Sequence, residues 1–196
     1  MLWIGLTGGL ASGKTSVANI LRKKNISVVC ADTLARSAVD KGTEGLRLVV
    51  SSFGKDLLTQ TGQLDRQKLA TKVFSQRSSL LKLEEIIHPI VRKLASEARE
   101  QLKREGKALA FYDVPLLFEK KMADLFDKVV VVNCSEAKQL ERAILRDHSN
   151  ETQVRQRLAN QMPLDEKVKL ADFVIENNEG LGQLEKAVEQ MLVALR

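Results

Sequence analysis

Glycine, lysine and hydroxyl residues near the start of the chain have the spacing of a loop that binds phosphate groups. Gly8 and Gly13 enclose four residues, and Lys14 and Thr15 follow directly. Consecutive backbone amides in such a loop form an anion site with the start of the next helix, and the lysine adds a mobile positive charge. The pattern therefore predicts phosphate binding. The candidate ligands are the loop and first-turn residues Gly9, Leu10, Ala11, Ser12, Gly13, Lys14, Thr15 and Ser16.

The residues after the second glycine indicate that the phosphates belong to ATP with magnesium. Lys14 is expected to bridge the β- and γ-phosphates as a catalytic cation, and the Thr15 hydroxyl to bind the Mg²⁺ that neutralises the same oxygens. The alternative is a glycine-rich turn with a solvated lysine. The apolar run at 2–6 before the loop and the helical pattern from Ser16 onward favour the phosphate site.

Two aspartates, Asp32 and Asp113, come shortly after apolar runs at 26–29 and 108–112. Ligands of open α/β sheets bind at the carboxyl ends of the strands, so either carboxylate could face the phosphates or contact the metal through water. A helix cap or a turn is the structural alternative for each. Phosphoryl transfer mainly needs a carboxylate that orients the acceptor hydroxyl and accepts its proton late, and we assign this catalytic role to Asp32.

Arginines with helical spacing form a second group of candidate ligands. Arg142 and Arg146 lie four residues apart, so a helix would place both on one face. Paired guanidinium groups suit triphosphate oxygens, and an arginine delivered to the transition state accelerates phosphoryl transfer by roughly 10³ to 10⁵. Surface ion pairs with Glu141 and Asp147 are the alternative. We predict that Arg142 is catalytic and that both arginines bind ATP.

Charge and composition narrow the class of partner. The formal charge of +6 favours anionic partners, but the chain has no long block of like charges, and one Trp, one Tyr and six Phe leave few rings for base stacking. No apolar stretch reaches the ~18 residues of a membrane span, and Cys30 and Cys134 lack a metal-type spacing. We expect a cytoplasmic protein without nucleic-acid or membrane partners, and the sequence carries no signal for an oligomeric state.

Five short apolar runs alternate with helical segments along the chain. This alternation predicts a parallel sheet with right-handed crossovers, that is, an α/β three-layer fold of the P-loop NTPase type with a five-stranded parallel sheet. The expected strands lie at 2–6, 26–29, 108–112, 129–132 and 173–175.

Two long helical segments interrupt the alternation. Residues 33–105 have the pattern of successive helices and are predicted to form an inserted helical subdomain, far longer than an ordinary crossover. Residues 136–171 carry four arginines and are predicted to form a mobile lid. The predicted nucleotide-binding core is then made of 1–32, 106–135 and 172–196.

A histidine-proline step lies inside the long helical insertion. His88 precedes Pro89, and proline is tolerated in the first turn of a helix but not in its middle. We therefore expect one helix to end there and another to begin. On its own, His88 is interpreted as a capping or core histidine.

The chain resembles the dephospho-coenzyme A kinase family over nearly its whole length. The phosphate loop is common to many nucleotide enzymes, whereas the histidine-proline step and the proline-leucine-leucine segment after Asp113 are more particular to this family. The matching stretches are 5–9 with 12–15, 31–32 with 35–36, 88–89, 113–119, and the positions Gln139, Arg142, Arg146, Asp147, Gln161, Lys167, Ala171, Asp172 and Asn177.

The resemblance implies a reaction and a set of site residues. It implies Mg²⁺-dependent transfer of the ATP γ-phosphate to the ribose 3′-hydroxyl of dephospho-coenzyme A, the final step of coenzyme A biosynthesis. It also implies a core, an acceptor domain and a lid, similar to nucleoside monophosphate kinases. Asn177 would contact adenine and Arg142 would act from the lid. The implied acceptor-side residues are Thr7, Asp32, Arg36, His88, Pro115, Leu116 and Leu117.

Two positions depart from the family pattern. Cys30 stands where the family usually has a first aspartate before Asp32, and Ala11 replaces a common glycine of the loop. Ala11 is expected to adopt a right-handed or extended backbone, and Cys30 would alter the polarity of the pocket. Neither change removes a predicted catalytic group.

Three other functions remain as alternatives. A kinase for a nucleotide or nucleoside would have a similar core and lid. A regulatory switch that hydrolyses nucleoside triphosphates slowly would bind nucleotide without acceptor-dependent turnover. A nucleic-acid binder would show affinity that falls steeply with salt.

Overall fold

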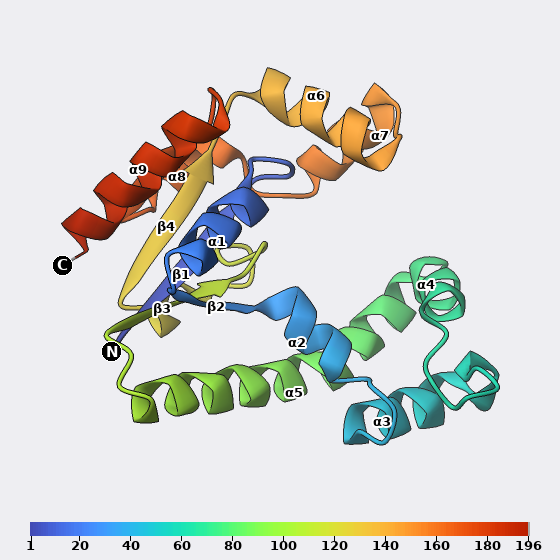
Figure 1. Ribbon diagram of the computed structural model, residues 1–196. Coiled ribbons are helices and arrows are strands. Elements are labelled where there is room, and N and C mark those ends of the chain that lie inside the picture. The colour runs from blue at the N-terminus through green and yellow to red at the C-terminus, as the bar shows by residue number, and fades with distance from the viewer. Residues whose placement is uncertain (196) are drawn as a thin grey trace. The chain divides into compact units, whose positions relative to one another are not determined.

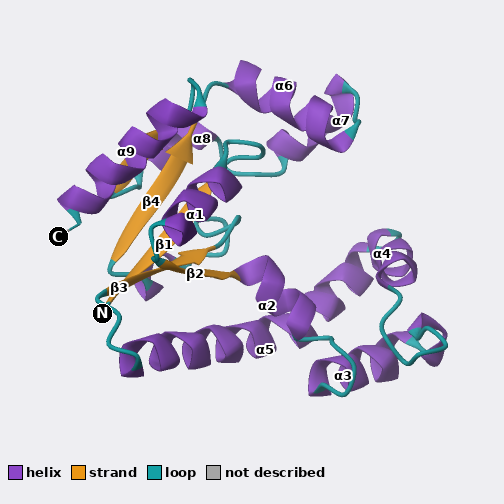
Figure 2. Cartoon of the chain, viewed as in Figure 1, coloured by secondary structure: helices purple, strands orange, loops and turns teal. Residues whose placement is uncertain are grey.

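The computed structural model describes residues 1–195, which form two compact units (Figure 1). The first, here called the sheet unit, contains Met1–Val29 and the chain from Leu102 onward. The second, the helical unit, contains Cys30–Gln101. Figure 2 shows that the helical unit consists of helices and loops, whereas the sheet unit combines strands with helices.

Five strands form the sheet, and their order confirms the predicted α/β fold with a five-stranded parallel sheet. The strands are β1 (Leu2–Gly8), β2 (Ser27–Cys30), β3 (Leu109–Asp113), β4 (Lys128–Asn133) and β5 (Phe173–Glu176). Their order across the sheet is β2-β3-β1-β4-β5. The central strand β1 pairs in parallel with β3 and β4, and β4 pairs in parallel with β5.

Helices α1 (Lys14–Lys23) and α9 (Leu181–Ala194) pack on one face of the sheet. Val130 and Val132 of β4 belong to the apolar core that they form. Val131, which points to the opposite face, is also fully buried. Burial on both faces explains why the strands appear in the sequence as continuous apolar runs.

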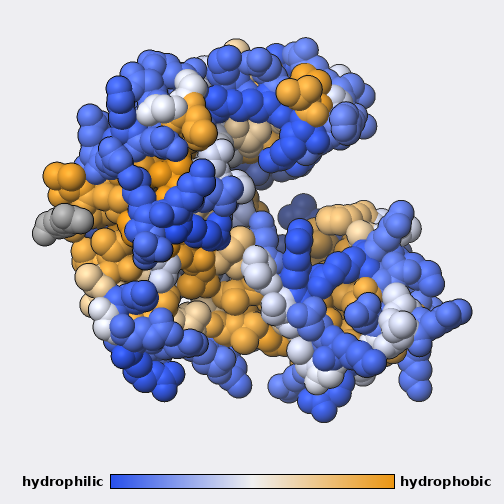
Figure 3. All heavy atoms as spheres, viewed as in Figure 1, coloured by the Kyte–Doolittle hydropathy of each residue, from blue (hydrophilic) through white to orange (hydrophobic). Residues whose placement is uncertain are grey.

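Three helices occupy the segment that was predicted to be a lid. They are α6 (Glu136–Asp147), α7 (Glu151–Ala159) and α8 (Leu164–Lys169). Ser135 caps α6, and Asn150 begins α7 with a capping box in which Gln153 returns a hydrogen bond. Hydrophilic side chains predominate on the visible side of α6 and α7 (Figure 3).

The helical unit has its own apolar core. Its elements are α2 (Ala31–Ser37), α3 (Glu44–Phe53), the 3₁₀ helix η1 (Lys55–Leu57), α4 (Arg66–Phe74) and most of α5 (Arg77–Arg104). Val49 and Leu57 are fully buried in this core. Thr43 caps α3 and Asp65 caps α4 through side-chain oxygens, as their residue types favour. Within residues 1–195, no helix has both the length and the apolar composition to cross a membrane.

The expected helix boundary at Pro89 is wrong, because α5 continues through it. Proline inside a helix costs ~3 kcal/mol, since it removes one hydrogen bond and clashes with the preceding turn. Leu80, Leu83 and Ile87 lie on one face of α5 and pack against the core of the helical unit. These side chains are partly buried, so each contributes less than the roughly 1.5–3 kcal/mol of full burial, and together they offset the local cost.

Candidate active site

The phosphate loop connects β1 to α1 and leaves the start of α1 available to an anion. Gly13 is the N-cap residue with a φ of 100°, and no side chain caps the helix. The first turn contains no acidic residue, and the first intrahelical bond runs from the Val17 amide to the Gly13 carbonyl. The amides of Lys14, Thr15 and Ser16 thus lie at the positive end of the helix, as phosphate binding requires.

Asn177 supports the loop from the end of β5. Its Nδ2 donates to the Ser12 carbonyl at 2.7 Å, and the residue is buried. A Cβ atom at Gly13 would overlap this amide, and the positive φ of Gly13 disfavours any other residue. The family resemblance implies that Asn177 contacts adenine, whereas its side chain here contacts the backbone of the loop.

Two glutamines hold the peptide groups of Leu10. Gln139 donates from Nε2 to the Leu10 carbonyl at 2.7 Å, and the Leu10 amide donates to Oε1 of Gln161 at 3.1 Å. A Cβ atom at Gly9 would overlap the Gln139 amide. The Leu10 amide, a predicted phosphate ligand, is therefore engaged by Gln161. No local sequence pattern indicates these two contacts, although both glutamines match the pattern of the resembled family.

Ala11 has a φ of 55°, so the expectation of a right-handed or extended backbone is wrong. The left-handed region costs an alanine roughly 1–2 kcal/mol, which explains why glycine suits this position. Ser12 follows with its hydroxyl buried and without a hydrogen-bond partner among the described residues. The loop is thus shaped by neighbouring contacts against the local preference of Ala11.

Lys14 forms an ion pair with Asp113 at the end of β3. Asp113 lies beside Leu6 of β1 in the sheet register, and the side chains of Lys14 and Asp113 are only 15% and 7% exposed. The predicted strand-end carboxylate therefore lies at the loop. An ammonium on a flexible four-carbon stem can contact this carboxylate and a phosphate oxygen in turn.

The residues at this edge fit magnesium that arrives with a nucleotide. Thr15 is exposed in the first turn of α1, and Asp113 lies beside Lys14 of the same turn. Magnesium typically takes one or two protein oxygens and completes its shell with water and phosphate oxygens. Residues 1–195 contain no cluster of three or more His, Cys, Asp or Glu side chains, which a fully protein-bound ion would need.

Arg142 and Arg146 share α6 but have different partners. Arg142 donates from Nη2 to the Asn177 carbonyl at 3.0 Å, and within the described chain its buried Nη1 has no partner. Burial raises the pKa of the neighbouring Cys134 thiol, and the Arg142 guanidinium opposes this. Arg142 thus reaches the residue that supports the loop.

Arg146 forms a surface ion pair, which was the alternative to a contact with ATP. It donates from Nε to Asp147 at 2.7 Å, and Arg157 of α7 donates to the same carboxylate. The two guanidinium groups hold the pKa of Asp147 far below its usual range, mainly through the hydrogen bond from Arg146. The structure therefore brings Arg146 to Asp147, while Glu141, the other expected partner, pairs with Lys138.

The predicted acceptor residues of the sheet unit lie in the turn after β3 or contact it. Thr7 donates its hydroxyl to the Pro115 carbonyl at 3.1 Å. Leu117 is fully buried, and a Cβ atom at Gly5 would overlap its side chain. Leu117 therefore has a packing role, whereas Pro115 and Leu116 are only half-buried.

The other predicted acceptor residues belong to the helical unit. Asp32 is exposed in the first turn of α2, and Arg36 is exposed in its last turn. His88 is exposed in the middle of α5, so its interpretation as a capping or core histidine is wrong. Cys30 is the N-cap residue of α2 and makes no side-chain capping bond, which the aspartate usual in the resembled family could form.

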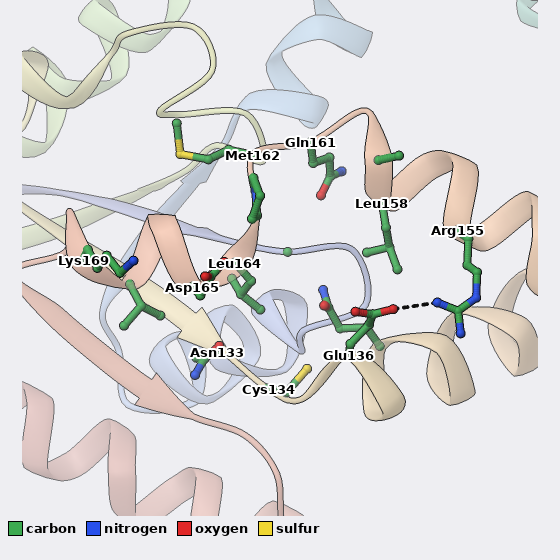
Figure 4. Close-up of a pocket in the computed structure, with 15 residues that line it drawn as sticks. Asn133, Cys134, Glu136, Arg155, Leu158, Gln161, Met162, Leu164, Asp165 and Lys169 are labelled. Atoms are coloured by element: carbon green, nitrogen blue, oxygen red, sulfur yellow. Dashed lines mark hydrogen bonds and ion pairs between the residues drawn. The ribbon is translucent and has the colours of Figure 1, made fainter.

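A cavity of about 860 Å³ lies between the loop and the helices α6 to α8 (Figure 4). Gly9 and Gln161 line it together with Leu158 and Leu164, and an ion pair between Glu136 and Arg155 crosses one side. The cavity therefore adjoins the residues that hold Leu10.

Comparison with known proteins identifies the family of this chain. A family model described as dephospho-CoA kinase matches residues 2–183. The chain belongs to the dephospho-CoA kinase family. The dephospho-CoA kinase of Bdellovibrio bacteriovorus is 43% identical over 192 residues, which cover 98% of this chain and 95% of the relative. That of Listeria monocytogenes is 42% identical over 185 residues, which cover 94% and 92%.

Solved structures of similar proteins cover almost the whole chain. The protein TT1252 of Thermus thermophilus matches with a TM-score of 0.82 and 34% identity, covering 100% of this chain and 98% of its own. The dephospho-CoA kinase of Campylobacter jejuni matches with a TM-score of 0.76 and 27% identity, covering 98% and 96%. A shikimate kinase of Acinetobacter baumannii, with a TM-score of 0.58 and 15% identity, shares the fold.

Proposed function

We propose that this protein transfers the γ-phosphoryl group of ATP to the ribose 3′-hydroxyl of dephospho-CoA, giving CoA and ADP in the last step of CoA biosynthesis. The observation that carries the proposal is the uncapped first turn of α1, with Lys14 beside it, in a chain of the dephospho-CoA kinase family. Relatives of that name match this chain over more than nine-tenths of its length.

The loop would act by placing positive charge where negative charge develops. The acceptor oxygen forms a bond to the γ-phosphorus, the bond from that phosphorus to the β–γ bridging oxygen breaks, and ADP leaves with the electron pair. Lys14 and the amides at the start of α1 stabilise the phosphate oxygens throughout this exchange. Bound magnesium, held by Thr15 and through water by Asp113, would neutralise the β- and γ-phosphate oxygens.

The acceptor hydroxyl loses its proton during the transfer, and Asp32 is our candidate to orient the hydroxyl and accept that proton. Its exposed carboxylate in the first turn of α2 is accessible to a ligand. Arg36 and His88, both exposed, are the accompanying candidates in the helical unit for binding dephospho-CoA. In the sheet unit, Thr7 and Leu117 would shape the turn that presents Pro115 and Leu116, since the hydroxyl of Thr7 and the side chain of Leu117 are engaged within the protein.

We assign lid motion to a narrower segment than 136–171. Gln139 and Arg142 tie the first turns of α6 to the loop and to Asn177, and Lys167 of α8 contacts the Gly8 carbonyl. The end of α6 and α7 carry the arginines that remain, Arg146, Arg155 and Arg157. In this proposal Arg146 reaches ATP by exchanging Asp147 for a phosphate oxygen.

An acceptor panel tests the function. Purified protein with MgATP is expected to convert dephospho-CoA to CoA, with little turnover of nucleoside monophosphates. Comparable turnover of a nucleoside monophosphate with none of dephospho-CoA would support a nucleotide kinase instead. Tight ATP binding with slow hydrolysis that no acceptor accelerates would indicate a regulatory switch.

The remaining assignments follow from this reaction. The small-molecule partners are ATP and dephospho-CoA, and a nucleic-acid partner is not part of the proposal. A cytoplasmic location agrees with Cys30 and Cys134, which are both free thiols.

A further inference from the structure

A buried lysine lies behind the phosphate loop. Lys167 of α8 is fully buried, and its Nζ lies 2.7 Å from Oε1 of Glu119. The same ammonium donates to the carbonyl oxygens of Gly8 and Pro115, each at 3.4 Å. Oε1 of Glu119 also accepts the Met162 amide at 3.0 Å. One buried cation therefore joins the end of β1, the turn after β3 and the helix α8.

Stability alone is a weak reason for such an arrangement. The desolvation of two buried charges offsets most of their attraction, and apolar side chains of similar volume often stabilise a fold as well or better. An ammonium differs from an apolar side chain in that it fixes the direction of the carbonyl groups around it. The carbonyl that matters for the reaction is that of Gly8, the last residue of β1 before the loop.

The peptide group of the Gly8 carbonyl carries the amide of Gly9. In a trans peptide, C=O and N–H point in opposite directions, so a Gly8 oxygen held toward Lys167 turns the Gly9 amide to the other side. The next residue, Leu10, is held at both peptide groups by Gln139 and Gln161. The backbone of 8–10 is therefore oriented by side chains from outside the loop.

We propose that Lys167 is a positioning residue for phosphoryl transfer, which holds the Gly8 carbonyl so that the Gly9 amide is presented to the ATP phosphates. Glu119 keeps the ammonium in place and, through the Met162 amide, fixes the segment that follows Gln161. This role rests on the proposed function and concerns the binding of ATP. It predicts that loss of Lys167 weakens the binding of ATP more than the binding of dephospho-CoA, whose proposed site includes the turn that Lys167 contacts at the Pro115 carbonyl.

The test compares a double variant with a neighbouring control. Lys167→Met with Glu119→Gln removes both charges, so that neither is left buried alone. Glu166→Gln removes an exposed charge from the same helix, at a residue that does not line the cavity beside the loop. ATP affinity is measured by calorimetry without acceptor, and the Gly9 amide is followed by NMR. The double variant is expected to bind ATP about tenfold more weakly with a shifted Gly9 resonance, as loss of a hydrogen bond from a charged group implies, whereas Glu166→Gln behaves as wild type.

The outcomes separate this role from the function itself. Wild-type protein that fails to bind MgATP would refute the proposed function. If wild type binds ATP and the double variant binds it equally well, with an unshifted Gly9 resonance, only the role of Lys167 is refuted. An equal loss of affinity for ATP and dephospho-CoA, together with a lower melting temperature, would show a merely structural role and also overturn the proposal.

A second variant covers failure of the double variant to fold. Lys167→Gln with Glu119→Gln also leaves no charge buried alone, and it keeps a neutral hydrogen-bond donor at position 167. ATP binding is then expected to weaken in the same direction and by less. Unchanged ATP affinity and an unchanged Gly9 amide in this variant would again overturn the role of Lys167.

Discussion

The contact between Lys14 and Asp113 couples the two groups on which the proposed chemistry depends. The ammonium starts α1 and the carboxylate ends β3, and both side chains are mostly shielded from water. A charge in such surroundings acts more strongly on a phosphate than a solvated one would. Because both side chains are shielded, removal of one would leave the charge of the other largely buried without a partner.

Replacement of Lys14 should abolish most of the activity. Lys14→Met is expected to lower kcat by about 10² to 10³, the usual effect of losing one group that stabilises transition-state charge. The single variant leaves Asp113 without its partner. The stability of wild type is therefore compared with that of a double variant that carries Lys14→Met and Asp113→Asn. Steady-state kinetics and a cooperative melt are the measurements, with Lys23→Met on the exposed side of α1 as the control. Near-normal turnover would refute the role of Lys14.

Ala11 carries backbone strain that glycine would relieve. Its φ of 55° costs roughly 1–2 kcal/mol, and the greater freedom of glycine in the unfolded chain returns about 0.4–1 kcal/mol of this. Ala11→Gly should therefore raise the free energy of unfolding by about 0.5–1 kcal/mol, measured by denaturant titration. Ala187→Gly, inside α9, should lower it by about 1 kcal/mol. A decrease for Ala11→Gly would show that the left-handed backbone is unstrained.

At the scale of elements, the end of α6 is joined to α7 through one carboxylate. Asp147 closes α6, the next residue His148 has a φ of 50°, and Arg157 of α7 returns to Asp147. The first turns of α6 are bonded to the loop and to Asn177, and α8 is bonded to the end of β1 through Lys167. We therefore propose that the end of α6 and α7 form the mobile part.

The Asp147 carboxylate should make the stability of the protein depend on pH, and the lowered pKa of Asp147 gives the direction of this dependence. The pKa of Asp147 is lowered from 3.8 in the fold, so its ion pairs stabilise the protein above pH ~4 and this contribution is lost as pH falls through the folded pKa. Asp147→Asn should be less stable than wild type by a constant amount from pH 7 to about 4, and the difference should shrink below that. Denaturant titrations of both proteins measure it. A difference that grows as the pH falls would contradict the assignment.

At the scale of the whole molecule, we propose that ATP binds to the sheet unit, whereas dephospho-CoA binds to the helical unit and to the turn after β3. The sheet unit contains the loop, α1 and the arginine helices, and the helical unit contains Asp32, Arg36 and His88. Each unit has an apolar core of its own. Each can therefore respond to its ligand separately.

Hydrogen exchange tests this division. MgATP at 100 times its dissociation constant should stabilise the state that binds it by about 2.7 kcal/mol. ATP is expected to slow exchange of amides in the loop and α1 of the sheet unit. Dephospho-CoA alone should slow exchange around α2 and α5 of the helical unit and in the turn after β3. ATP protection confined to the helical unit would refute the division.

The sequence by itself determined the features that depend on short spacing. The phosphate loop and the strand ends each depend on a few neighbouring residues, and the inner strands were found because burial on both faces gives continuous apolar runs. Features that depend on distant contacts were decided only by the tertiary structure. Packing of α5 overrides Pro89, and contacts around the loop hold Ala11 in a left-handed backbone. Lys167 and Gly8 are 159 residues apart in the sequence, and no local sequence pattern indicates a hydrogen bond over such a separation.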